Sequence, residues 1–206
     1  METLSVIWFL LVVVLLAVYI VLDGFDFGVG ILSLFRKEDS EKRIYMNSIG
    51  PIWDGNEVWL IAGGGSIFAA FPLVYATAFS GFYLAIYLLL LALFMRAVSF
   101  EFRSKSESPV YRKIWDLCFG IGSLLPALLL GVAFGNIMRG LPLNESKVFT
   151  GSFFELLNPY SVLIGLLSLF AFTMHGAIYL THKTDGDLKD ANEKIATKLW
   201  MVVVVL

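Results

Sequence analysis

Apolar residues occur along this chain in blocks long enough to cross a lipid bilayer, and short polar strips separate them. Five blocks cover residues 4–35, 51–71, 75–98, 114–137 and 160–181. An α-helix rises about 1.5 Å per residue and the hydrocarbon core is about 30 Å thick, so each block predicts one full span. A sixth helix is expected to begin near Ile195. Because only its last eight residues are apolar, rising about 12 Å, we expect the chain to be part of something longer.

Composition supports a membrane protein. Hydrophobic residues make up 58% and charged residues 16%, whereas soluble domains are about half apolar and a quarter charged. The net charge of −2 provides no basic surface for nucleic acid. The single cysteine, Cys118, cannot form an internal disulfide. The first block lacks a basic leader and a cleavage site, so we expect a retained span rather than a signal peptide.

The basic residues predict the orientation. Of the 15 Lys and Arg residues, all but Arg139 and Lys147 follow the first, third or fifth block. The positive-inside rule makes that side cytoplasmic and places the N-terminus outside. Pro72 lies between the second and third blocks, which are expected to form an antiparallel hairpin. Gly63, Gly64 and Gly65 favour close helix packing in the second span.

Two acids inside the first span are the strongest chemical signal. Asp23 and Asp26 are three residues apart and share a helix face. Asp26 lies about 15 Å from the cytoplasmic boundary set by Arg36. Gly24 and Gly28 would let another helix approach that face. Two carboxyls in a poorly solvated site should not both be ionised, which suits a proton relay or support of a cofactor site. The alternative is a structural carboxylate paired with Arg or with hydroxyls.

A second polar group opens the second span. Asp54 and Glu57 lie in its first turn, where the helix dipole favours acids. Asp54 stands between Trp53 and Trp59, so it is also a candidate for the mouth of a proton path. Interfacial tryptophans are otherwise common membrane-belt residues.

The remaining polar residues carry weaker signals. Arg96, Glu101 and Arg103 end the third span, where snorkelling and charge pairing are favoured, although an arginine there could hold a haem propionate or a lipid phosphate. His175 and His182 lie two turns apart on one helix, so they cannot clamp one haem between them. These residues alone do not separate a proton-coupled transporter from a subunit of an energy-converting complex.

Five motifs carry a family resemblance. In order and spacing they closely resemble subunit II of cytochrome bd-type quinol:oxygen oxidoreductases. The motifs are DGFDFGVG at 23–30, IGPIWDGNEVWL at 49–60, IFAAFP at 67–72 with AFSGFY at 78–83, RAVSFEFRSK at 96–105, and GSLLP at 122–126 with GVAFG at 131–135. The resemblance extends to Asn158-Pro159-Tyr160.

The resemblance implies an all-α fold of eight spans in two four-helix bundles. Residues 1–140 would form the first bundle and residues 141–206 the start of the second. It implies a prokaryotic cytoplasmic-membrane complex with subunit I, which carries haem b, haem d and the quinol site, and it allows small single-span subunits. No cofactor or metal would be ligated by this chain. Oxygen would be reduced to water with protons from the cytoplasmic side, which generates a membrane potential.

The resemblance also implies roles for individual residues. Asp54 matches a proposed proton-entry acid, and Asp23 and Asp26 match acids of the proton route or of the haem region; Glu57 is grouped with the route. Arg96 matches an arginine that supports the haem region. Trp53 and Trp59 match weak contacts to quinone or lipid. A proton-coupled transporter that uses the same acids, and a purely structural scaffold, are the competing hypotheses.

Overall fold

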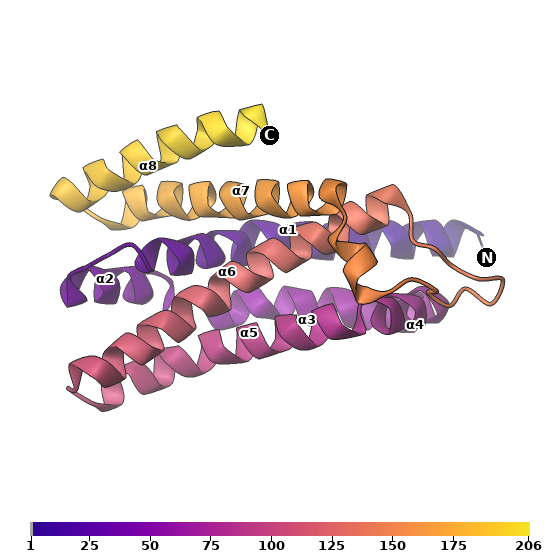
Figure 1. Cartoon of the computed structure of the whole chain (residues 1–206), viewed down its shortest axis with the longest axis horizontal. Coiled ribbons are helices and arrows are strands. Elements are labelled where there is room, and N and C mark those ends of the chain that lie inside the picture. The colour runs from indigo at the N-terminus through magenta and orange to yellow at the C-terminus, as the bar shows by residue number, and fades with distance from the viewer. Residues whose placement is uncertain (1) are drawn as a thin grey trace.

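Long helices running side by side form the molecule (Figure 1). The computed structural model describes residues 2–206, and within that range the chain forms eight α-helices and two short 3-10 helices. The α-helices are α1 Glu2–Ser33, α2 Asp39–Ile49, α3 Trp53–Ala70, α4 Pro72–Gly81, α5 Tyr83–Phe102, α6 Pro109–Arg139, α7 Pro159–Lys183 and α8 Gly186–Val205. The 3-10 helices are η1 Arg103–Lys105 and η2 Phe153–Leu157. The predicted all-α polytopic bundle is confirmed.

Four of the described helices are long and apolar enough to cross a membrane. They cover Thr3–Ser33, Tyr83–Lys105, Pro109–Arg139 and Pro159–Lys183. The block predicted to span over 51–71 does form a helix, α3, but it is not among these four. Its first turns hold Asp54, Asn56 and Glu57, which reduce its apolar length.

The prediction of the third span was wrong over its first residues. Residues 75–98 were expected to form one helix, whereas Pro72 opens the separate ten-residue α4, which ends at Gly81. The span itself begins at Tyr83. The last helix also begins earlier than expected, at Gly186 rather than near Ile195. Polar residues fill its first turns, so the apolar pattern does not mark its start.

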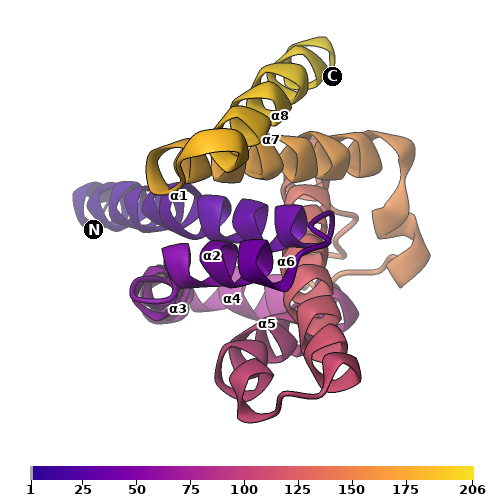
Figure 2. The ribbon, with the colours of Figure 1, turned by 90° about the vertical axis from the view of Figure 1, so that its left-hand side faces the viewer.

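Different elements lie at the two ends of the bundle. Figure 1 shows α2, the α5–α6 turn and the α7–α8 turn at one end, and the N-terminus, α4 and the loop before α7 at the other. Figure 2, viewed along the bundle, shows α7 and α8 above α1, and α3 to α5 below it. The alternation of ends follows the order expected for a protein that crosses the membrane repeatedly.

Glycine allows α1 and α7 to pack closely. A methyl group on Gly28 would collide with the Phe172 carbonyl and with the Gly176 backbone, and one on Gly176 would collide with Gly28. Gly24 similarly faces the Phe172 ring. The expectation that a helix approaches the Gly24–Gly28 face is confirmed, and that helix is α7. Asp23 and Asp26 lie on a different face of α1, which is directed at Arg96 of α5 and Asn56 of α3.

Candidate functional site

Arg96 is the centre of a buried polar cluster. Its side chain is fully buried, and Nη2 lies 2.9 Å from Asp23 Oδ1 and 3.7 Å from Asp26 Oδ2. Nη1 donates a hydrogen bond to Glu57 Oε1 at 3.0 Å. One guanidinium from α5 therefore joins carboxylates from α1 and α3. The charge pairing expected for Arg96 is confirmed. The expected snorkelling to the surface was wrong, because acids inside the bundle compensate the charge.

Aromatic rings and a close helix contact hold the guanidinium. Its Cζ lies 4.7 Å from the centroid of the Phe27 ring and 5.9 Å from that of Trp53. Such contacts between a cation and a ring face are attractive, more so away from water. Trp53 in turn stacks on Phe100, with the ring centroids 4.7 Å apart. Gly122 of α6 packs against the backbone of α5 at Arg96. Helix α6 therefore supports α5 at the position of the arginine.

Asn56 belongs to the cluster as well. Its Nδ2 donates to Asp26 Oδ2 at 2.7 Å and to the Leu22 carbonyl at 3.3 Å. Asn56 was given no role on the sequence alone. The available signal was the helical period, because Trp53, Asn56 and Glu57 are three and four residues apart and share one face.

Asp54 lies outside this cluster. It is exposed, and the groove that it lines has a volume of about 530 Å³. The groove lies between α3 and α5, with Trp53, Phe94, Glu101 and Phe102 among its other lining residues. Glu57, whose side chain is 21% exposed, connects this outer region with Arg96. The polar groups therefore form a series from the exposed Asp54 to the buried Asp23.

Tyr19 extends the cluster along α1. It is buried one turn before Asp23, and its hydroxyl lies beside that carboxylate without the geometry of a hydrogen bond. Tyr19 also lines an apolar cavity of about 450 Å³ between α1, α3, α6 and α7. Trp59 packs against the neighbouring apolar core, so it faces a different environment from Trp53. The sequence interpretation did not identify Tyr19, because tyrosine in an apolar block carries no distinctive signal.

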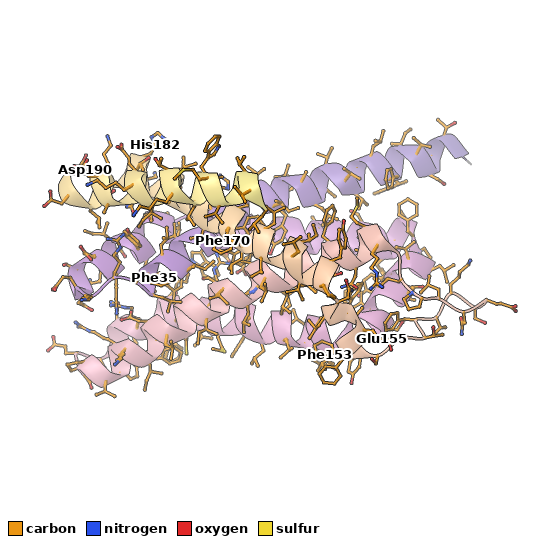
Figure 3. All side chains as sticks on the ribbon, turned by 45° about the horizontal axis from the view of Figure 1, so that its top comes forward. Phe35, Phe153, Glu155, Phe170, His182 and Asp190 are labelled. Atoms are coloured by element: carbon orange, nitrogen blue, oxygen red, sulfur yellow. The ribbon has the colours of Figure 1, made fainter. Side chains whose placement is uncertain are left out.

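The two histidines are apart from the Arg96 cluster. The ring of His175 packs edge-on against Phe25 at 5.6 Å between centroids. His182 lies at one end of the bundle, near Phe35 and Asp190, whereas Phe153 and Glu155 lie at the other (Figure 3). Among the residues that the structure describes, no group of three or more His, Cys, Asp and Glu is placed to hold a metal ion.

A second charge network ties α2 to the α5–α6 turn. Arg103 donates to Asp39 Oδ1 at 2.6 Å and to Asp116 Oδ1 at 2.5 Å, and Lys42 donates to Asp116 Oδ2 at 3.0 Å. Burial raises the pKa of the Asp39 carboxyl, but the hydrogen bond and charge of Arg103 and the charge of Arg112 outweigh it and hold that pKa below its usual value. The charge pairing expected for Arg103 is therefore confirmed.

Comparison with known protein families identifies the family of this chain. A family model described as cytochrome bd terminal oxidase subunit II matches residues 4–206. The chain belongs to this family. It is 51% identical over 192 residues to cytochrome bd-I ubiquinol oxidase subunit 2 of Escherichia coli K12, and 49% identical over 194 residues to a probable cytochrome oxidase subunit 2 of Haemophilus influenzae. It is 42% identical over 206 residues to cytochrome bd ubiquinol oxidase subunit 2 of Bacillus subtilis.

These subunit II relatives are longer than the chain. The alignments cover 91%, 92% and 100% of the chain but only 51%, 51% and 61% of the E. coli, H. influenzae and B. subtilis proteins. The fold is similar to a chain in the structure of bd oxidase from Geobacillus thermodenitrificans, with a TM-score of 0.80 and 21% identity. That match covers 96% of this chain and 61% of the other. The chain therefore spans about half to three fifths of its relatives.

Proposed function

We propose that this chain acts as subunit II in a cytochrome bd-type terminal oxidase, which oxidises quinol and reduces oxygen to water. The observation that carries the proposal is the Arg96 cluster, in which the first, second and fourth family motifs meet inside a membrane bundle. Membership of the subunit II family supports it. The complex would lie in a prokaryotic cytoplasmic membrane with the N-terminus of this chain outside.

The proposal assigns the redox groups to a partner. Subunit I would bind haem b and haem d, which supply electron transfer and oxygen reduction, and would oxidise the quinol. Small single-span subunits could complete the assembly. The groove beside Trp53 would contact lipid or quinone, whereas Trp59 is the weaker candidate because it packs against the core.

The acids of this chain would form a route for protons from the cytoplasmic side. Asp54 is exposed at the groove, Glu57 is partly exposed, and Asp26 and Asp23 are fully buried. A carboxyl group can take up and release a proton at each of these positions. Protons consumed in water formation would enter here, so oxygen reduction would generate a membrane potential without a pumping step.

Arg96 and Asp26 would in addition support the haem region of the complex. Their cluster ties α1, α3 and α5 together through ion pairs and a hydrogen bond inside the bundle. Rigid elements hold a neighbouring site more precisely than loops do. We therefore propose that this side of the bundle shapes the surface against which subunit I assembles.

Oxygen uptake by the purified complex tests the proposed function. The chain is tagged in its complete natural subunit, the complex is extracted in mild detergent, and oxygen consumption is measured with a reduced quinol. We expect quinol-dependent uptake that co-purifies with the tag. A proton-coupled transporter built on the same buried acids is the competing function. It would give solute uptake in vesicles without haem or quinol oxidation, and that result would replace the oxidase proposal.

A further inference from the structure

Three carboxyl groups surround a single cation inside the bundle. Asp23 and Asp26 are fully buried, as is Arg96, and Glu57 completes the group from α3. Asp26 Oδ1, both oxygens of Asp23 and the Nε of Arg96 are buried without a hydrogen-bond partner. Further titratable neighbours are Tyr19, on α1 itself beside Asp23, and Tyr179 of α7 near Asp26. Neither tyrosine adds a positive charge.

The charges of this group do not balance if every acid is ionised. Three carboxylates and one guanidinium would leave two uncompensated negative charges in a poorly solvated interior. Burying an unpaired charge is so unfavourable that the group takes up a proton instead. Glu57 accepts a hydrogen bond from Arg96 Nη1 at 3.0 Å, and its side chain is 21% exposed, so its charge is compensated directly and it is less confined than the two aspartates. The required proton must therefore reside on one of the two fully buried aspartates.

The contacts to Arg96 distinguish the two aspartates. Asp23 Oδ1 lies 2.9 Å from Nη2, whereas the nearest oxygen of Asp26 lies 3.7 Å from the same nitrogen. An opposite charge favours the ionised form most strongly at the shortest distance. Asp26 Oδ2 instead accepts a hydrogen bond from the Asn56 amide, and a neutral acid can still accept such a bond through its carbonyl oxygen.

We propose that in the resting protein Asp26 holds a proton and is neutral, whereas Asp23 is ionised and is the counter-ion of Arg96. Asn56 then acts as a positioning residue, because its Nδ2 donates to Asp26 Oδ2 and is itself held in place by the Leu22 carbonyl of α1. The inference deepens the proposed function and rests on it only for the use of the proton. It assigns storage of the proton to Asp26, and it assigns the exchange of protons with the surface to Glu57.

Isotope-edited infrared spectroscopy of the complete complex tests this assignment. Aspartate labelled with ¹³C in its side-chain carboxyl identifies any protonated aspartic acid by the shift of its carbonyl stretch, which separates it from Glu57 and from lipid esters. We expect one such band in the wild-type protein. It should be lost in Asp26→Asn, and in Asp26→Glu the carboxyl band should remain but no longer respond to the label. The matched variant Asp23→Asn should keep the band.

Protein yield gives a second readout of the same assignment. Asn resembles a neutral aspartic acid in size and charge, so Asp26→Asn should accumulate better than Asp23→Asn, which removes the counter-ion of Arg96. Absence of a label-sensitive band in the wild type, its loss in Asp23→Asn but not in Asp26→Asn, or better accumulation of Asp23→Asn would overturn the proposal. The band belongs to this chain and needs no turnover, so a colourless or inactive complex would remove the oxidase function but leave this assignment intact.

Discussion

Arg96 shows how a buried charge becomes part of a stable membrane bundle. Its guanidinium contacts Asp23 of α1 and Glu57 of α3 at about the same distance, 2.9 and 3.0 Å. Removing one partner of a buried ion pair is far more harmful than removing an exposed pair, because the other partner keeps its charge without compensation. The arginine and its acids therefore depend on one another.

Arg96→Gln should destabilise the protein strongly. Loss of the cation leaves Asp23 and Glu57 facing each other, and the free energy of unfolding should fall by roughly 3–5 kcal/mol. Thermal unfolding followed by circular dichroism measures the effect. The matched control is Arg112→Gln, whose partner Asp39 is 45% exposed and for which about 0–1 kcal/mol is expected. Equal effects of the two substitutions would contradict the central position of Arg96.

Asp54→Asn should slow oxygen reduction while the haem content of the complex stays normal. Asp54 is exposed at the groove and lies outside the Arg96 cluster, so its loss removes a proton acceptor without disturbing packing. Oxygen uptake across a range of pH and quantitative haem spectra measure the two effects. Glu145→Gln, an exposed change in the loop before α7, serves as the control. Unchanged turnover of Asp54→Asn at every pH would exclude the proton-entry role.

The sequence identified most of the site residues but few of their partners. Asp23 and Asp26 were recognisable because an acid inside an apolar block demands an explanation. Pairing of these acids with an arginine was one of two alternatives, and the choice of Arg96 needed the fold, because 70 residues of chain separate Asp26 from it. Asn56 lies in a first turn that is already polar, and Tyr19 lies in an apolar block, so neither residue stands out from its surroundings.

At the scale of elements, glycine contacts set the distance between α1 and α7. Gly28→Ala should destabilise the bundle, because its methyl group would collide with the Phe172 carbonyl and the Gly176 backbone. Overpacking of this kind typically costs about 1–3 kcal/mol. Thermal unfolding of the purified complex measures the loss.

Gly64→Ala is the matched control for this packing. The same added methyl group on α3 has no atom within 4 Å, and Ala is favoured over Gly inside a helix. We expect the stability of Gly64→Ala to be unchanged or slightly higher. If Gly64→Ala lost as much stability as Gly28→Ala, the collision with α7 would not be the cause of the loss.

Helix types were predictable from the sequence, whereas some helix boundaries were not. The apolar blocks located α1, α6 and α7 closely. Pro72 was correctly recognised as a break, but the short α4 between it and Tyr83 is as apolar as the span that follows. Hydropathy cannot divide two adjacent apolar helices. The amphipathic α2 was missed because its eleven residues lie in a polar strip.

At the scale of the molecule, the bundle predicts a defined topology in the membrane. The loop before α7 and the N-terminus should face outward, and the α5–α6 turn should face the cytoplasm, because basic residues concentrate there. In a Cys118→Ser background, a thiol reagent that does not cross membranes should label Glu145→Cys in intact cells but not Glu107→Cys. Both positions are exposed. Labelling of Glu107→Cys but not of Glu145→Cys would show that the chain has the opposite orientation.

Hydropathy and the charged loops predicted the overall class of the molecule, because a bilayer permits few backbone arrangements. They did not predict how the spans pack. The contact of α7 with α1 and α6 joins segments on both sides of the predicted division at residue 140, and that division remains a prediction. Packing between membrane helices depends on small residues and shape, which a single sequence specifies only weakly.

The central claim is that this chain works in a haem-containing quinol oxidase. A dithionite-reduced minus air-oxidised spectrum of the complex that co-purifies with the chain, tagged at its N-terminus in the complete subunit, tests it most directly. We expect bands of b-type and d-type haem in a fixed ratio to the tagged chain. A colourless preparation, obtained under extraction conditions that keep the partner subunit bound, would contradict the claim and make a proton-coupled transporter the working hypothesis.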